Sequence, residues 1–570
     1  MTRARWFALV LVVAIVTIVW AMLPPAAERL TLAPDPLVAR GAIHVHTVRS
    51  DGAGTPERVA GAARRAGLDF VVLTDHGDAI TRDHDPPRYI DGVLLIDAVE
   101  ISTEDGHLLA LGIENAPYRL AGEARDVIED VHRLGGFAIA AHPDSPKPEL
   151  QWRDWKAAID GLEWINADSE WRDEPRLTLT RALFTYWVRP GETMASLFDR
   201  PVRTLERWDS LGVTRPVVAI AGHDVHARIP LSGQSEVGEG RTLGLPSYES
   251  AFRTLSQAVI LEAPLRRTAE SAASDAGAIL GALRSGATYT VIDGLAGPAS
   301  LDFHVVVLDG KGVRMGESLD TGGLRQYVAI VKPAVPGAIT VLFRDGHEVA
   351  RAIDGRSLRA PGLGDTRGSY RVEVRLPRAP GTPPVPWIVS NPIYVGPTSN
   401  AVSPGEAPAA EVRPLFDGTL GAWTIERAPT SEGRVEVASR GTQRNLHFTW
   451  RLAGGAPSGQ YAALVVPVQG AIVKEFTSLS VRVHARHPLR VSVQVRIPQG
   501  GGLRWKRSIY LDEAARDIVI DLNDMKPIEA PPGTRLDLSR IDTLLIVVDT
   551  VNALPGTTGE CWIEDVRWRR

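Results

Sequence analysis

Cysteine is almost absent from this chain of 570 residues, because Cys561, near the C-terminus, is the only one. A disulfide framework and a cysteine-based metal site are therefore excluded. The chain also lacks an excess of positive charge: 63 basic residues stand against 68 acidic ones, and the net charge is −5. This balance disfavours nucleic acid as an obligatory partner. There is no internal repeat of fixed short period, and at this length several domains are expected.

Charged residues are missing from positions 6–23, an apolar run of eighteen that follows Arg3 and Arg5 and stops at Pro24. Eighteen helical residues span about 27 Å, close to the roughly 30 Å core of a bilayer. We interpret residues 1–24 as a transmembrane anchor with a cytoplasmic N-terminus, which places the rest of the chain on the extracytoplasmic side, periplasmic or at the cell surface. A cleaved signal peptide, which would leave a secreted protein, is the alternative, although no A-x-A-like cleavage site follows the run.

Short apolar runs alternate with helical patterns between residues 38 and 295. The expected strands cover 42–46, 70–74, 93–99, 108–113, 137–141, 162–165 and 217–221. The expected helices cover 55–67, 122–134, 176–188, 194–211 and 272–285, and the first has Thr55 as N-cap and Pro56 at its first position. Several strands are continuous runs of Val, Ile, Leu and Ala, which is typical of parallel strands covered on both faces. Repeated strand–helix units predict an α/β barrel whose active site lies at the carboxyl ends of its strands.

An all-β pattern begins near residue 299. Apolar residues alternate over 301–307, Asp345–Gly346 predicts a hairpin turn, and we assign residues 299–396 to a small β-sandwich. Residues 397–414, rich in Pro, Ser and Ala, are interpreted as a linker. Alternation resumes in residues 415–570, which are similar to jelly-roll modules of the galactose-binding-like type and are expected to form a second sandwich. Four tryptophans there are candidates for a carbohydrate-stacking platform or for the core: Trp423, Trp450, Trp505 and Trp562.

Histidine is unevenly distributed, with nine of the fourteen before residue 230. Most of these histidines, together with several carboxylates, close an apolar run that is predicted to be a strand. Residues i and i+2 of a strand point to the same side, so His44 and His46 can both reach one ion, and so can Asp224 and His226. Nitrogen and oxygen ligands gathered from several strand ends are what a site for two or three divalent metal ions requires.

These motifs resemble those of the polymerase and histidinol phosphatase (PHP) family of metal-dependent phosphoesterases. The resemblance covers residues 41–226, with similar sequence to about residue 293, and implies a distorted seven-stranded (βα)7 barrel, similar to a TIM barrel, that holds up to three ions. It is carried by His44-x-His46, Ser50-Asp51-Gly52, Thr74-Asp75-His76, Glu100, Ala-His142-Pro-Asp and Gly222–His226. It assigns metal-ligand roles to His44, His46, Asp51, His76, Glu100, His142, Asp224 and His226, and in such sites the glutamate typically bridges two ions.

One feature of the family is missing. Many members place a His or Cys after the strand that corresponds to residues 162–165, whereas this chain has neither, and Asn166 or Asp168 is the nearest substitute. Two ions are therefore as compatible with the sequence as three, and Zn, Mn and Fe all accept such ligands. Asp75 is expected to orient a ligand, or to have a structural role at its strand end. His107 is a candidate ligand or supporting residue, with a structural role as the alternative.

The ligand set predicts hydrolysis of a phosphate ester. Closely spaced metal ions activate a water molecule and offset the charge that develops on a phosphate. Direct attack by that water is the economical mechanism, since the barrel has no cysteine and no G-x-S-x-G elbow. A proton for the leaving group would come from His226, from His107 or from a bound water. Arg49 and Lys147 are candidates for holding the phosphate of a small-molecule or envelope-derived substrate, or are solvated charges.

Two other functions stay open. A metal-dependent amidohydrolase acting on a non-phosphorylated substrate would use similar ligands. A non-enzymatic alternative is an anchored surface protein that binds carbohydrate through residues 415–570 and has an inactive barrel. Burying so many ionisable side chains together without metal would be costly, which favours an enzyme.

Overall fold

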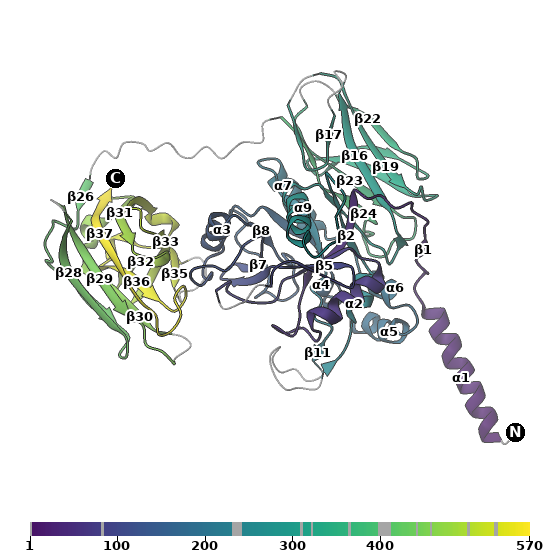
Figure 1. Cartoon of the computed structure of the whole chain (residues 1–570), viewed down its shortest axis with the longest axis horizontal. Helices are drawn as coiled ribbons and strands as arrows, with labels where there is room; N and C mark the ends of the chain where they lie inside the picture. The colour runs from purple at the N-terminus through teal and green to yellow at the C-terminus, as the bar shows by residue number, and fades with distance from the viewer. Residues whose placement is uncertain are drawn as a thin grey trace. The chain divides into compact units, whose positions relative to one another are not determined.

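The computed structural model describes residues 3–80, 85–230, 242–307, 312–320, 323–362, 366–396, 412–440, 443–455, 459–498, 502–528 and 534–570. Two compact units divide the chain. The first contains residues 1–77, 83–114 and 128–401, and the second contains residues 78–82, 115–127 and 402–570. In Figure 1 the second unit is mostly green and yellow. Most of the expected linker, residues 397–411, lies outside the described residues.

Helix α1 (Arg3–Met22) contains the apolar run near the N-terminus. Its window Arg5–Met22 has a mean hydropathy of 2.3 and is long and apolar enough to cross a membrane, a test that a signal sequence would also pass. Among the described residues it is the only helix of this kind.

The strands of the expected barrel divide between two sheets. One has the order β10-β9-β8-β7-β6 and contains β6 (Val99–Thr103), β7 (Gly106–Leu111), β8 (Phe137–Ala140), β9 (Gly161–Asn166) and β10 (Val218–Gly222). The other includes the path β14-β13-β2-β3-β5-β4, with β2 (Val38–Val45), β3 (Phe70–Leu73), β4 (Arg88–Ile90), β5 (Val93–Asp97), β13 (Ser256–Ile260) and β14 (Thr288–Val291).

These sheets do not form a clear TIM-barrel topology, so the expected (βα)7 barrel needs correction. Among the described residues, isolated bridges join the sheets between Val45 and Val225 and between His76 and Glu100, and the His223 N–H donates to the Ile43 carbonyl at 2.9 Å. β2 changes register against β3 between Ile43 and Val45, and the intervening His44 has a φ of +65°. The site residues therefore lie where regular pairing ends.

The prediction of parallel strands is also only partly correct. β6 and β7 are antiparallel, and Thr103 pairs with Gly106 across a two-residue turn. Strands joined by so short a connection can only be antiparallel, since a parallel pair needs a crossover. β8 is antiparallel to β7, and β13 is antiparallel to β2, whereas β2, β3 and β5 are parallel as expected.

Helices pack around these sheets. The first predicted helix is confirmed as α2 (Pro56–Ala66), with the Thr55 side chain accepting a hydrogen bond from the Arg58 N–H and Gly67 in the left-handed region at the C-cap. The single helix expected over 194–211 is wrong: the chain forms α6 and α7 instead, and Pro201 precedes α7 because proline cannot continue a helix. The other helices of this region are α3 (Ala124–Arg133), α4 (Ala167–Arg172), α5 (Arg176–Tyr186), α6 (Pro190–Ala195), α7 (Val202–Gly212), α8 (Tyr248–Phe252) and α9 (Ala272–Ser285).

The first β-sandwich shares a sheet with the α/β region, because β24 pairs with β14. Its four-stranded sheet contains β16 (Ser300–Val307), β17 (Val313–Arg314), β19 (Arg325–Lys332) and β22 (Leu358–Gly362). The shared twelve-stranded sheet continues with β18 (Ser318–Leu319), β20 (Ile339–Arg344), β21 (His347–Ala352), β23 (Gly368–Arg375), β24 (Ile388–Ser390) and β25 (Ile393–Val395). Short pairs join β1 (Glu28–Arg29) to β15 (Ala296–Gly297) and β11 (Ile229–Pro230) to β12 (Thr242–Leu243).

The second unit contains a β-sandwich of two six-stranded antiparallel sheets. One contains β26 (Val412–Pro414), β28 (Glu432–Arg440), β29 (Gln443–Arg451), β31 (Ser478–Ala485), β34 (Arg516–Asp521) and β37 (Thr558–Arg569). The other contains β27 (Thr424–Arg427), β30 (Tyr461–Pro467), β32 (Leu489–Ile497), β33 (Leu503–Leu511), β35 (Lys526–Ile528) and β36 (Thr543–Asp549), and a short helix, α10 (Gly470–Val473), lies between β30 and β31.

Three of the four tryptophans proposed as a stacking platform belong to the core of this sandwich. Trp423, Trp450 and Trp505 are 3%, 7% and 2% exposed. The ring of Trp562 is stacked between the imidazoles of His447 and His484, at centroid distances of 4.8 and 5.0 Å. Both faces of the Trp562 ring are therefore covered, and none of the four presents an open face for a sugar.

Candidate metal centre

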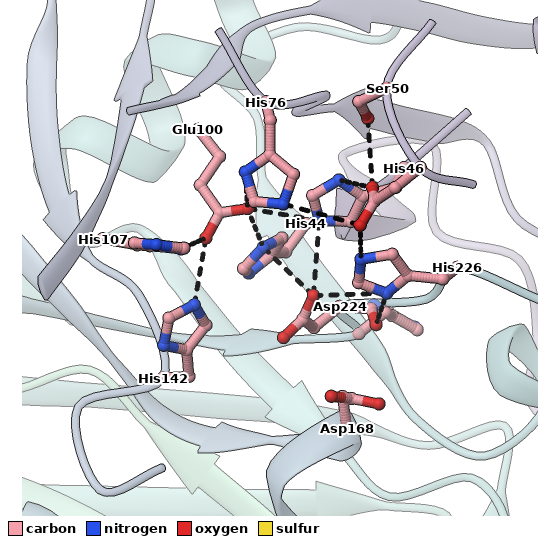
Figure 2. Close-up of polar contacts among 12 residues, drawn as sticks. His44, His46, Ser50, His76, Glu100, His107, His142, Asp168, Asp224 and His226 are labelled. Atoms are coloured by element: carbon pink, nitrogen blue, oxygen red, sulfur yellow. Dashed lines mark hydrogen bonds and ion pairs between the residues drawn. The ribbon is translucent and has the colours of Figure 1, made fainter. Parts of the chain in front are cut away.

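The predicted ligands come together from separate segments of the first unit, where its two sheets meet (Figure 2). Each takes part in a group whose ligand atoms lie within 4.8 Å of one another, and His107 joins one of these groups. The residues are His44, His46, Asp51, His76, Glu100, His107, His142, Asp224 and His226.

The first group consists of two histidines and the carboxylates of Glu100 and Asp224. The Nε2 atom of His44 lies 3.2 Å from Oε2 of Glu100 and 3.4 Å from Oδ1 of Asp224. The Nε2 atom of His46 lies 3.3 Å from each of the same two oxygens. All four side chains are buried. Two imidazole nitrogens and two carboxylate oxygens are a complete four-ligand set for a divalent ion.

A second group is built around Asp51. Its Oδ2 atom lies 3.1 Å from Nε2 of His226 and 3.8 Å from Nε2 of His76, and its Oδ1 atom lies 3.4 Å from Nδ1 of His46. The group is more exposed than the first, since the side chains of His76 and His226 are 33% and 19% exposed. It therefore forms the open side of the centre.

Glu100 connects the groups through its two oxygens. Oε1 lies 2.8 Å from Nδ1 of His107 and 2.9 Å from Nε2 of His142, whereas Oε2 faces His44, His46 and His76. Figure 2 shows the carboxylate between these two sets of rings. A carboxylate with one oxygen toward each set fits the bridging role that the resemblance to the PHP family implies.

Three site residues have backbone conformations that L-amino acids rarely adopt. The φ angles of His44, His142 and Asp224 are +65°, +29° and +47°. Each such residue costs on the order of 1–3 kcal/mol and persists only where the surrounding structure holds it. All three lie just where a strand ends or shifts register, so the strain is associated with directing their side chains into the centre.

Four buried atoms of the centre have no hydrogen-bond partner among the described residues: Nε2 of His44, Nδ1 and Nε2 of His46, and Oε2 of Glu100. Buried polar atoms in native proteins are nearly always paired, because an unpaired one costs free energy. Nε2 of His44, Nε2 of His46 and Oε2 of Glu100, together with Oδ1 of Asp224, are the candidate ligand atoms of the first group. A divalent cation is the partner that this donor set fits.

The electrostatic balance also favours bound cations. Burial alone would lower the pKa of His46, but the nearby carboxylates of Asp224 and Glu100 raise that pKa to about 10. The pKa of His44 is likewise raised well above its usual value, because Asp224, Glu163 and Glu100 outweigh the effect of burial. Burial would raise the pKa of Glu100, but the charges of His76 and His44 and contacts with other ring nitrogens lower it well below its usual value. The negative field therefore draws protons to these imidazoles, and divalent cations would compete for the same atoms.

Glu163 is the functional residue that the sequence interpretation missed. It lies within β9 and is 1% exposed, and its Oε1 accepts a hydrogen bond of 2.6 Å from Nδ1 of His44. Its Oε2 accepts hydrogen bonds from the His142 N–H at 2.6 Å and from Nδ2 of Asn166 at 2.8 Å. A Cβ atom on Gly222 would lie 2.0 Å from Oε1, so glycine is needed opposite. The sequence signal that could have identified Glu163 is a charged residue inside an otherwise apolar strand.

We expect Glu163→Gln to weaken metal binding by about 10- to 100-fold, the usual effect of removing a residue that orients a ligand. The hydrogen bond to Nδ1 leaves the Nε2 lone pair of His44 facing the centre, and a neutral amide holds that tautomer less firmly. Calorimetric titration with Mn²⁺ or Zn²⁺ measures the effect. The matched control is Glu170→Gln, in which the altered carboxylate accepts a hydrogen bond from the backbone N–H of Asp199 and belongs to none of the ligand groups. Equal affinities for both variants would contradict the role of Glu163.

The proposed substitutes for the missing family ligand are engaged elsewhere. Oδ1 of Asn166 accepts from the Ser169 N–H as the N-cap of α4, and its amide nitrogen faces Glu163 and Asp224. Asp168 accepts hydrogen bonds from Trp171 and Arg172. His107, from β7, occupies the place beside Glu100 and His142.

Asp75 supports the loop that carries Asp51. Its carboxylate accepts hydrogen bonds from the Thr47 N–H at 2.6 Å, from the Thr47 hydroxyl at 2.8 Å and from the Ser50 hydroxyl at 2.6 Å. These contacts hold the loop that carries the candidate ligand Asp51.

A cavity of about 150 Å³ opens onto the centre. Three basic residues line it beside the ligands: Lys147, Arg172 and Arg228. Only Lys147 was anticipated. Arg49 does not line this cavity, because its guanidinium pairs with Asp97 and Asp85.

Comparison with known proteins adds three findings. No family model matches the chain. A two-domain protein from Bacteroides vulgatus, which contains a predicted PHP-like metal-dependent phosphoesterase, is 14% identical and covers 64% of this chain and 99% of its own, with a TM-score of 0.29. The family 11 carbohydrate-binding module of a cellulosomal cellulase of Clostridium thermocellum is 17% identical and covers 28% and 95%, with a TM-score of 0.24.

A curated relative is more similar in sequence. The uncharacterized protein MJ1587 of Methanocaldococcus jannaschii is 30% identical over 142 residues, which are 22% of this chain and 80% of that protein. This chain therefore belongs to the same family as MJ1587.

Proposed function

We propose that this chain is a metal-dependent phosphoesterase of the PHP type, acting on the extracytoplasmic side of a membrane. The proposal rests first on the buried atoms of His44, His46 and Glu100 that make no hydrogen bond among the described residues and that fit a divalent cation. Divalent cations held there would lower the pKa of a water molecule and polarise a phosphoryl oxygen.

The basic residues of the cavity favour a phosphate ester over an amide. Lys147, Arg172 and Arg228 line the cavity together with Asp51 and His226. Cationic side chains beside metal ligands would hold phosphate oxygens and offset their charge, which a neutral amide or lactone does not need. This observation favours the phosphoesterase over the amidohydrolase alternative.

The ligand groups accommodate up to three ions. His44, His46, Glu100 and Asp224 would hold the most buried one, and Asp51, His76 and His226 would hold the most exposed one. We propose that Glu100, His107 and His142 hold the remaining one, with His107 in place of the ligand that the sequence lacks after β9. His107 and His226 then act as ligands, and their role as proton donors to the leaving group stays a prediction.

The experiment is metal analysis of the purified full-length chain, combined with a panel of phosphomonoesters, phosphodiesters, amides and lactones. We expect two or three bound equivalents of Zn, Mn or Fe, hydrolysis of phosphoesters, loss of activity with a chelator, and its return when metal is restored. Turnover of amides or lactones alone would support the amidohydrolase. A folded, metal-free chain without activity would support the inactive, glycan-binding alternative.

A further inference from the structure

Helix α5 (Arg176–Tyr186) and the two residues after it present a large apolar surface. The side chains of Leu177, Phe184, Trp187 and Val188 are 83%, 55%, 70% and 53% exposed. They are spaced at i, i+7, i+10 and i+11, so they follow one side of the helix. Isolated exposed apolar residues are ordinary, but four large ones along one side of a helix and its end indicate a contact surface.

The opposite side of α5 is already packed. Tyr186 is 9% exposed and contributes to a small apolar cluster with Met194, Leu197 and Leu245. The helix is therefore held to the first unit by one face, and the exposed set lies on the face that nothing in the described residues covers.

This surface lies beside the end of α1, as Figure 1 shows. Nε of Arg181 donates to the Met22 carbonyl at 2.8 Å, and Nη1 of Arg189 donates to the Pro24 carbonyl at 2.6 Å. The Arg189 guanidinium also lies 6.0 Å from the ring of Trp20, which is 69% exposed. The apolar set is thus next to the point where the candidate span ends.

The composition of residues 176–189 matches a membrane interface. The segment contains three arginines, Arg176, Arg181 and Arg189, and no acidic residue. Tryptophan is enriched at the level of lipid headgroups, and arginine there contacts their phosphates. Trp20 and Trp187 would both occupy that level.

We propose that α5 and residues 187–188 lie in the headgroup region of the membrane that α1 crosses, so that the first unit rests on the bilayer surface. The occupant of the apolar face is lipid. The inference rests on α1 acting as an uncleaved anchor, and is independent of the chemistry of the metal centre.

Single cysteines test this in the full-length chain reconstituted in vesicles, because the native Cys561 is buried. A polarity-sensitive fluorophore is placed at Phe184→Cys or Val188→Cys. We expect a blue shift, loss of emission with nitroxide-labelled lipid, and protection from aqueous iodide. The matched control is Val213→Cys: Val213 is 58% exposed, belongs to the same unit and follows α7, and its label should be quenched by iodide alone.

A fourth site, Val12→Cys in α1, separates the anchor from the docking surface. Lipid quenching at Val12 but iodide quenching at Phe184 and Val188 would overturn the docking and leave the anchor intact. Absence of lipid quenching at Val12 would overturn the anchor on which the inference rests. Labels at Phe184 and Val188 that are shielded from both quenchers would indicate a protein partner or a second copy, and would also overturn it.

Discussion

Asp224→Asn should abolish phosphoester hydrolysis, with a loss of about 10³-fold in kcat/KM. Oδ1 of Asp224 lies 3.4, 3.3 and 3.7 Å from ring nitrogens of His44, His46 and His226, so one oxygen serves two ligand groups. An amide keeps the shape of the side chain but removes its charge. A metal ion contributes several kcal/mol to a transition state, and about 4 kcal/mol corresponds to the stated loss.

The measurements are kcat/KM on the best phosphoester and metal content by elemental analysis. We expect at least one fewer bound equivalent in Asp224→Asn, and the same direction of change in His44→Ala. The matched control is Asp302→Asn, which alters an Asp–His contact of 2.9 Å on β16 of the same unit, where Asp302 is 54% exposed. Folded Asp224→Asn and His44→Ala proteins with full metal-dependent activity would reject these two residues as ligands.

Arg371→Met should lower the stability of the first unit by about 3–5 kcal/mol, the cost of removing one partner from a buried ion pair. The guanidinium of Arg371, on β23, bonds both oxygens of Asp209, on α7, at 2.7 Å and Oε1 of Glu373 at 2.6 Å. Burial alone would raise the pKa of Glu373, but Arg371 and Arg200 lower it to about 2, so the carboxylate stays charged at neutral pH. Without Arg371, Asp209 loses this bidentate cation.

Thermal unfolding of the first unit measures this loss, which corresponds to a decrease of about 6–10 °C in Tm. The matched control is Arg351→Met on β21. Arg351 pairs with Glu348 but is 60% exposed, and exposed pairs contribute about 0–1 kcal/mol. Metal content should be unchanged in both variants. Similar Tm values for Arg371→Met and the wild-type chain would show that the buried pair does not stabilise the junction between α7 and β23.

The clustering of the candidate ligands could be predicted because their signal is local. His44 and His46 follow an apolar run, and Asp224 and His226 follow another, and the ends of neighbouring strands meet in space. Helix α2 was equally predictable, since Thr55 and Gly67 are caps whose effect depends only on nearby backbone. In contrast, the helical period of residues 194–211 continues across the break between α6 and α7, so periodicity alone predicts one helix where the chain forms two.

The sequence by itself therefore indicated many of the elements, the candidate span and the ligand types of the candidate centre, because periodicity, capping and residue identity are properties of short segments. Only the tertiary structure decided which strands pair: the strands show no clear TIM-barrel topology, and β14 joins the first sandwich through β24. It also decided that Glu163 supports His44 and that His107 reaches Glu100. These contacts join residues from different strands, and their free energy depends on burial and on close approaches, such as Gly222 against Glu163, that no local pattern records.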